Sequence, residues 1–115
     1  MLNINRILQQ DRLLRATTGL NHKAFEELLV KFELVYLSTR QEREQARKRK
    51  IGAGRKAQLK TMKEKLFYIL FYLKCYPTYD LASVLFDFDR AQAYRWVHRL
   101  QPILEKTLGE KKVLP

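Results

Sequence analysis

The sequence predicts an all-α fold built around one small core. Only four Gly and three Pro are spread over 115 residues. No stretch alternates apolar and polar residues for long, whereas apolar residues recur with the 3.6-residue period of helices. The 46% hydrophobic content, with six Phe, six Tyr and one Trp, supplies the core that a disordered basic tail lacks. The length suits one domain, so a two-domain enzyme is excluded.

Two helices are expected in the N-terminal part. The first covers roughly residues 3–15 and ends before Gly19, a helix-stop residue. Asn21 caps the second, which we expect to continue to about Leu37. The apolar faces consist of Ile4, Ile7, Leu8 and Leu14 in the first helix and of Phe25, Leu28, Leu29, Phe32 and Tyr36 in the second.

Positive charge is concentrated in the middle of the chain. Lys plus Arg is 23 and Asp plus Glu is 12, which gives a formal net charge of +11. Between residues 40 and 65 there are eleven Lys or Arg against three Glu, so this quarter of the chain holds most of the excess. We expect a frayed helix end and then a basic linker. The charge favours a polyanionic partner, with nucleic acid first and an anionic membrane surface second.

A third helix is expected over residues 62–75. Thr61 and Glu64 form a capping box at its start, and Pro77 ends it before Thr78 caps the next helix. Because the helix is apolar almost all round, neighbouring helices should surround it. Its apolar run, residues 66–76, is too short to span a membrane, and the N-terminus has no export signal.

The segment after Pro77 has the layout of a helix-turn-helix. Two helices, residues 79–86 and 90–100, are joined by a three-residue turn. Asp89 is a good N-cap for the second helix, and Asp87 lies where the turn needs a left-handed residue. The inward residues are expected to be Ala82, Phe86, Phe88, Ala93 and Trp96, with Ser83 and Ala93 small enough for a close crossing.

The outward face of the second helix is the candidate DNA-reading surface, since this helix of the motif lies in the major groove. Arg can bond guanine bidentately, Gln can bond adenine, and Tyr or Ala can touch a thymine methyl. The face comprises Arg90, Ala91, Gln92, Tyr94, Arg95, His98 and Arg99. A helical hairpin that merely carries surface arginines is the competing interpretation.

A basic arm is the second candidate DNA contact. Its residues are Lys48, Arg49, Lys50, Arg55 and Lys56, around a Gly-Ala-Gly step that lets the backbone lie close to phosphates or enter an A·T-rich minor groove. A solvated linker and a nuclear-localisation signal are the alternatives.

Catalytic, metal and cofactor sites are not expected. Asp80, Asp87 and Asp89 are the only acidic cluster, and the last two already have turn and cap roles. His22 and His98 lack ligand spacing and should lie on helix surfaces. The single cysteine, Cys75, suits a reducing cytosol and should be a small core residue.

These patterns predict four segments along the chain. An N-terminal helical segment covers residues 1–46, and a basic Gly-containing linker covers 47–60. A helix-turn-helix DNA-binding segment covers 61–109, and a tail covers 110–115.

Several motifs resemble the N-terminal helix-turn-helix part of bacterial insertion-sequence transposases of the DDE superfamily. They are KRKIGAGRKAQL at 48–59, KLFYILFYLKCYPTYDLASVLF at 65–86 and RAQAYRWVHRLQPILEKTLG at 90–109, preceded by TGL and a Phe-Glu-Glu-Leu-Leu helix at 18–29. The chain departs from that family at Asp87, where Gly is usual, and at Phe88 and Asp89, where a small apolar residue and Ser are usual.

The resemblance implies binding to the terminal repeats of a mobile element. In that family a following RNase H-like domain carries three metal-binding carboxylates, so we expect this chain to be a first reading frame or an excised domain without catalytic activity. Double-stranded DNA is the expected partner, with the catalytic portion of a transposase and a second copy of the chain as further candidates. The expected location is the bacterial cytoplasm, at the nucleoid. A self-contained transcriptional regulator or RNA-binding protein and a helical adaptor are the alternatives.

Overall fold

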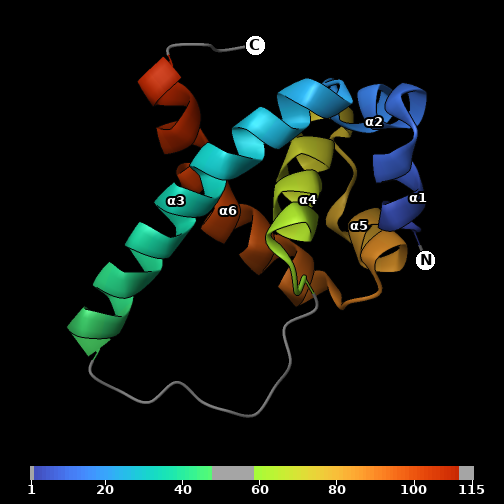
Figure 1. Cartoon of the computed structure of the whole chain (residues 1–115). Helices are drawn as coiled ribbons and strands as arrows, with labels where there is room; N and C mark the ends of the chain where they lie inside the picture. The colour runs from blue at the N-terminus through green and yellow to red at the C-terminus, as the bar shows by residue number, and fades with distance from the viewer. Residues whose placement is uncertain (1, 48–58, 112–115) are drawn as a thin grey trace.

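The protein is a bundle of short and long helices (Figure 1). The computed structural model describes residues 2–47 and 59–111, which form six helices and no strand. The predicted all-α fold is therefore confirmed. The helices are α1 Ile4–Gln9, α2 Asp11–Thr18, α3 His22–Arg47, α4 Met62–Cys75, α5 Tyr79–Phe86 and α6 Arg90–Lys111.

The N-terminal part holds three helices, and the predicted pair is wrong at its first member. Gln10 takes an extended conformation, φ −119° and ψ 111°, and separates α1 from α2. Asp11 begins α2 and accepts a 2.6 Å hydrogen bond from the backbone N–H of His22, at the start of α3. Residues 9–12 include no Gly or Pro, so no helix-stop residue marks the break that this long-range contact accompanies. Gly19 ends α2 with φ 83°, as expected.

Helix α3 is longer than its apolar stripe predicted. It begins after Asn21, whose side chain accepts from the N–H of Ala24 at 2.8 Å, and continues past Leu37 to Arg47. The added turns are rich in Gln, Glu, Arg and Ala, which are good helix formers without any apolar face. Helix propensity therefore accounts for the part of α3 that continues beyond its apolar stripe.

Helix α4 is the centre of the bundle. The predicted capping box is present, with the Thr61 hydroxyl accepting from the Glu64 N–H at 3.1 Å. All seven residues from Lys65 to Phe71 are buried. Helices α2, α3 and α6 contact α4, so the prediction of a surrounded helix is confirmed.

Cys75 is exposed, so its predicted place in the core is wrong. It is the last residue of α4, and the next residue, Tyr76, turns the chain with φ 50° and ψ 53°. The buried stretch of α4 ends at Phe71, one turn before Cys75. The thiol is therefore exposed, with its Sγ atom 3.9 Å from the Thr17 carbonyl oxygen of α2.

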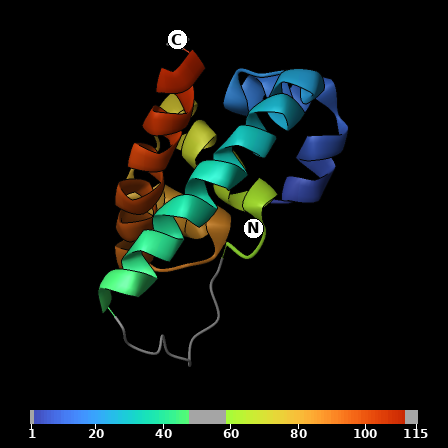
Figure 2. The same cartoon turned by 60° about the vertical axis from the view of Figure 1, so that its left-hand side comes forward.

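One continuous core joins the N-terminal helices to the C-terminal ones. Leu14 of α2, Phe25 of α3, Phe67 of α4 and Leu100 of α6 all have no exposed surface. The Leu2 N–H also donates to the Leu85 carbonyl of α5 at 2.7 Å. Figure 2 shows α1 and α2 packed at the N-terminal end of α3, while the other end of α3 extends beside α6.

Candidate nucleic-acid interface

Helices α5 and α6 form a helix-turn-helix with the predicted turn. The Thr78 hydroxyl accepts from the Leu81 N–H at 3.0 Å and caps α5. Asp87 is left-handed, with φ 59° and ψ 47°, as its position in the turn requires. The Asp89 carboxylate accepts from the Gln92 N–H at 2.8 Å and caps α6. Local side-chain and backbone chemistry therefore fixes the angle at which α6 leaves the turn.

An aromatic cluster holds the two helices against α4. The ring of Tyr68 meets Phe86 edge-on at 4.8 Å and Phe88 at 5.6 Å, measured between ring centroids. Its hydroxyl donates a 2.8 Å hydrogen bond to the Ala93 carbonyl of α6. Burial, followed by the neighbouring Tyr72 and Tyr79, raises the pKa of Tyr68 well above its ordinary value. This neutral hydroxyl fixes the first turn of α6 relative to the core.

The predicted orientation of α6 is confirmed. The five residues expected to face inward, from Ala82 to Trp96, are all buried. Gln92 is half-buried, and the other candidate reading residues are exposed: Arg90, Ala91, Tyr94, Arg95, His98 and Arg99. Their contact with DNA stays a prediction.

Ring contacts hold part of this outward face in place. Tyr94 meets His98 one turn later, with 4.0 Å between ring centroids, and meets Tyr79 of α5 edge-on at 5.6 Å. The Nδ1 atom of His98 lies 3.1 Å from the Tyr94 carbonyl. Arg90 pairs with Asp80 at 3.6 Å, but both side chains are so exposed that the pair contributes little to stability. The reading face therefore combines ordered rings with solvated arginines.

Beneath the reading face lies a cation cluster that the sequence did not reveal. The Lys65 Nζ atom is 5.6 Å from the ring centroids of both Tyr36 and Trp96. The Arg99 guanidinium lies 5.3 Å from the Trp96 ring and 6.0 Å from Tyr36. Burial, followed by Arg99, lowers the pKa of Lys65, and Arg40 adds to the effect. The one available signal was a lysine directly preceding the apolar run of α4.

Lys65 also holds the start of the C-terminal half. Its ammonium group donates to the carbonyls of Leu59 at 2.8 Å and Lys60 at 3.3 Å. The side chain of Leu59 is buried. Leu59 and Lys60 therefore lie beside the cation cluster.

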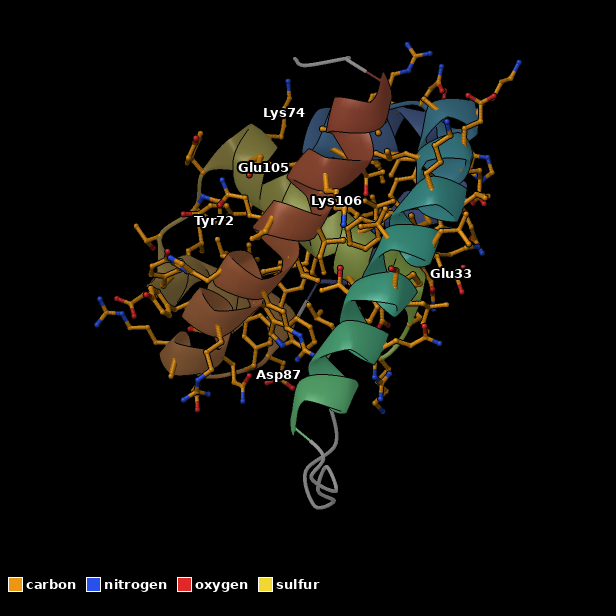
Figure 3. The ribbon with its side chains drawn as sticks, turned by 90° about the vertical axis from the view of Figure 1, so that its left-hand side faces the viewer. Glu33, Tyr72, Lys74, Asp87, Glu105 and Lys106 are labelled. Atoms are coloured by element: carbon orange, nitrogen blue, oxygen red, sulfur yellow. The ribbon has the colours of Figure 1, made fainter. Side chains whose placement is uncertain are left out.

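An open groove lies between α3 and α6 and adjoins the reading face. It has a volume of about 630 Å³, and none of the lining residues whose side chains the structure describes is acidic. Figure 3 shows Lys106 between the ribbons of α6 and α3, whereas Tyr72 and Lys74 lie on the other side of α6. The lining consists of Thr39, Tyr94, Arg95, His98, Arg99, Pro102, Ile103 and Lys106.

Comparison with known protein families identifies the C-terminal half of the chain. Residues 57–110 match the family described as "Helix-turn-helix of DDE superfamily endonuclease". This segment is similar to that family, and we call it the DDE-type helix-turn-helix. The match covers α4, α5 and nearly all of α6, the helix whose outward face holds the candidate reading residues. No curated protein and no solved structure matches the chain.

The predicted basic arm precedes the described part of the DDE-type helix-turn-helix. Lys48, Arg49, Lys50, Arg55 and Lys56 lie outside the described residues. Their role in DNA binding stays a prediction.

The acidic and histidine residues that the sequence analysis considered as metal ligands take structural positions. Asp80 pairs with Arg90, and Asp89 caps α6. His22 is exposed and lies 3.8 Å from Glu26 on the surface of α3. Within residues 2–47 and 59–111, no three His, Cys, Asp or Glu residues gather closely enough to hold a metal ion. No described helix is long and apolar enough to cross a membrane.

Proposed function

We propose that this chain binds the terminal repeats of a mobile element sequence-specifically, as the DNA-binding portion of a transposase. The observation that carries the proposal is a DDE-type helix-turn-helix whose second helix turns an exposed basic face outward. Exposed Arg90 and Arg95 can reach guanine edges in the major groove, and Tyr94 can contact a thymine methyl. The phosphate backbone supplies most of the affinity for a protein with a net charge of +11.

Arg95→Ala tests the reading face. We expect the variant to bind the terminal repeat more weakly by about 1–3 kcal/mol and to lose preference at one base position, because a bidentate guanine contact is removed. Fluorescence anisotropy with an end-repeat duplex and a shuffled duplex of equal composition measures both effects.

Arg12→Ala is the matched control, because Arg12 is an exposed arginine on α2, away from α6. Equal losses for Arg95→Ala on both duplexes would contradict a base-reading role. Wild-type preference for a promoter palindrome over the end repeats would favour a transcriptional regulator instead.

Substitutions in the basic arm test how much phosphate contacts contribute to the affinity for DNA. If Lys48, Arg49 and Lys50 meet phosphates, replacing all three by Gln should weaken binding to every duplex alike. The slope of log affinity against log salt should fall by up to about 3, near 0.9 for each lost contact. An unchanged slope would show that the basic arm makes no phosphate contacts and is only a linker.

We further infer that the chain itself neither nicks nor joins DNA. In-line attack at phosphorus needs a rigid set of carboxylates and metal ions, which we assign to the catalytic portion of a transposase acting as a partner. We also propose that a second copy of the chain binds as a partner. The proposed location is the cytoplasm, at the nucleoid. Incubating labelled end-repeat duplex with Mg²⁺ should give a shifted band and no cleavage product, and the stoichiometry of that complex gives the copy number.

A further inference from the structure

The groove between α3 and α6 continues the basic surface past the reading face. Three cations lie along the side of α6 that lines the groove, at intervals of four and seven residues: Arg95, Arg99 and Lys106. At 1.5 Å per residue, this stripe is about 16 Å long. Glu105, the nearest acid on α6, lies on the other side of that helix in Figure 3, and it pairs with Gln101 at 3.3 Å. The described lining of the groove therefore carries three cations and no acid, a charge that suits a polyanion.

Arg99, which lines the groove, lies beside a second cation, the buried Lys65. Arg99 is held over the Trp96 ring at 5.3 Å, and Lys65 lies on the same ring at 5.6 Å. The lowered pKa of Lys65 reflects burial first and then the nearby Arg99 guanidinium, while the Glu64 carboxylate acts in the opposite direction. Lys65 of α4 and Arg99 of α6 thus repel one another here, and a bound anion relieves that repulsion.

We propose that this groove holds the sugar–phosphate backbone of one strand of the bound duplex, an inference that rests on the proposed entry of α6 into the major groove. An α-helix about 10–12 Å across fills a major groove about 12 Å wide, so a backbone passes along each side of it. On one side of α6, the wall opposite the helix is α3, with Thr39 facing the groove. One strand then lies between α6 and α3 and fixes the docking direction of the reading helix.

The N-terminal helices therefore belong to the DNA-binding unit. The family match begins at residue 57 and leaves out α3, yet α3 supplies one wall of the groove. Phosphate contacts here set position and affinity without reading sequence.

Thr39→Glu in the full chain tests whether a DNA strand lies against the α3 wall of the groove. Thr39→Gln is the neutral control, because Gln has the same length as Glu. The carboxylate should weaken binding to the end repeat and to the shuffled duplex by the same factor, whereas the amide should bind like wild type. Lys106→Gln should lower the salt slope by about 0.9 and the affinity by up to about eightfold at 0.1 M salt. Lys23→Gln, at the far end of α3, should change neither.

The outcomes separate this inference from the proposed function. Wild-type binding that discriminates the end repeat, together with unchanged affinity and slope in Thr39→Glu and Lys106→Gln, would overturn the groove assignment alone. Failure of the wild-type chain to bind either duplex would overturn both.

Ethylation interference on the unmodified chain gives a readout that does not depend on folded variants. Interfering phosphates should extend further along one strand than along the other, because only one strand lies against α3. Short and equal runs on both strands would contradict the proposal.

Discussion

Trp96 combines deep burial with an unpaired donor. Its side chain is 6% exposed, and its Nε1 atom has no hydrogen-bond partner among the described residues. Leaving a buried N–H unpaired costs about 1–3 kcal/mol, while burying the ring stabilises the fold. The ring, rather than the indole N–H, is therefore what stabilises the contact between α6 and the core.

Two substitutions separate the ring from its N–H group. We expect Trp96→Ala to lower the free energy of unfolding by about 3–5 kcal/mol, because it leaves a cavity. Trp96→Phe keeps an aromatic ring and removes the unpaired donor, so it should cost only about 1 kcal/mol. Urea titration followed by circular dichroism measures both, and a loss as large for Phe as for Ala would show that the N–H has a partner.

Asp87 occupies a conformation that suits glycine better. At φ 59° and ψ 47°, an L-residue other than Gly carries steric strain. We expect Asp87→Gly to raise the free energy of unfolding by up to about 1 kcal/mol, and Asp87→Ala to lower it. Thermal melting reports both changes, and a fall of several degrees for the Gly variant would mean that the Asp side chain stabilises the turn.

At the scale of elements, α4 sets the position of α6 through one buried hydroxyl. Tyr68 donates to the Ala93 carbonyl, and burial raises its pKa above the ordinary value of 10.0. The unfolded chain therefore loses this proton at a lower pH than the folded chain. The stabilisation by Tyr68 is complete below pH 10 and is lost as the pH rises from there toward the folded pKa.

Tyr68→Phe tests this contact and its pH dependence. At pH 8 the variant should lose about 0.5–1.5 kcal/mol of unfolding free energy through the missing hydrogen bond. Between pH 10 and 11 the gap to wild type should shrink, since only wild type has this proton to lose. Urea titrations at the two pH values measure the gap. Tyr94→Phe, at an exposed tyrosine, is the matched control, and a gap that stays constant would contradict the pKa shift.

At the scale of the whole molecule, one core couples the N-terminal helices to the DDE-type helix-turn-helix. Leu14 of α2 is fully buried in the same cluster that contains Trp96. We expect Leu14→Ala to cost about 2–5 kcal/mol and to lower the unfolding midpoint equally by circular dichroism and by Trp96 fluorescence. An unchanged fluorescence midpoint would mean that residues 1–46 unfold as a separate unit.

Local chemistry in the sequence was enough to predict most of the helices and the reading face. The Thr61 capping box, the Asp89 cap and the left-handed Asp87 each depend on atoms within a few residues. The same holds for the inward and outward faces of α6, which follow from a 3.6-residue period once a core exists. Sequence motifs likewise pointed to the family that residues 57–110 match.

Tertiary structure decided what depends on residues far apart in the chain. The break at Gln10 accompanies a contact between Asp11 and His22, and the exposure of Cys75 depends on how the neighbouring helices pack. The cation cluster forms only because folding brings Lys65 and Arg99 to the rings of Tyr36 and Trp96. Helix caps and apolar helix faces depend on residues close together in the sequence. The groove between α3 and α6, by contrast, forms only because packing places two helices from opposite halves of the chain side by side.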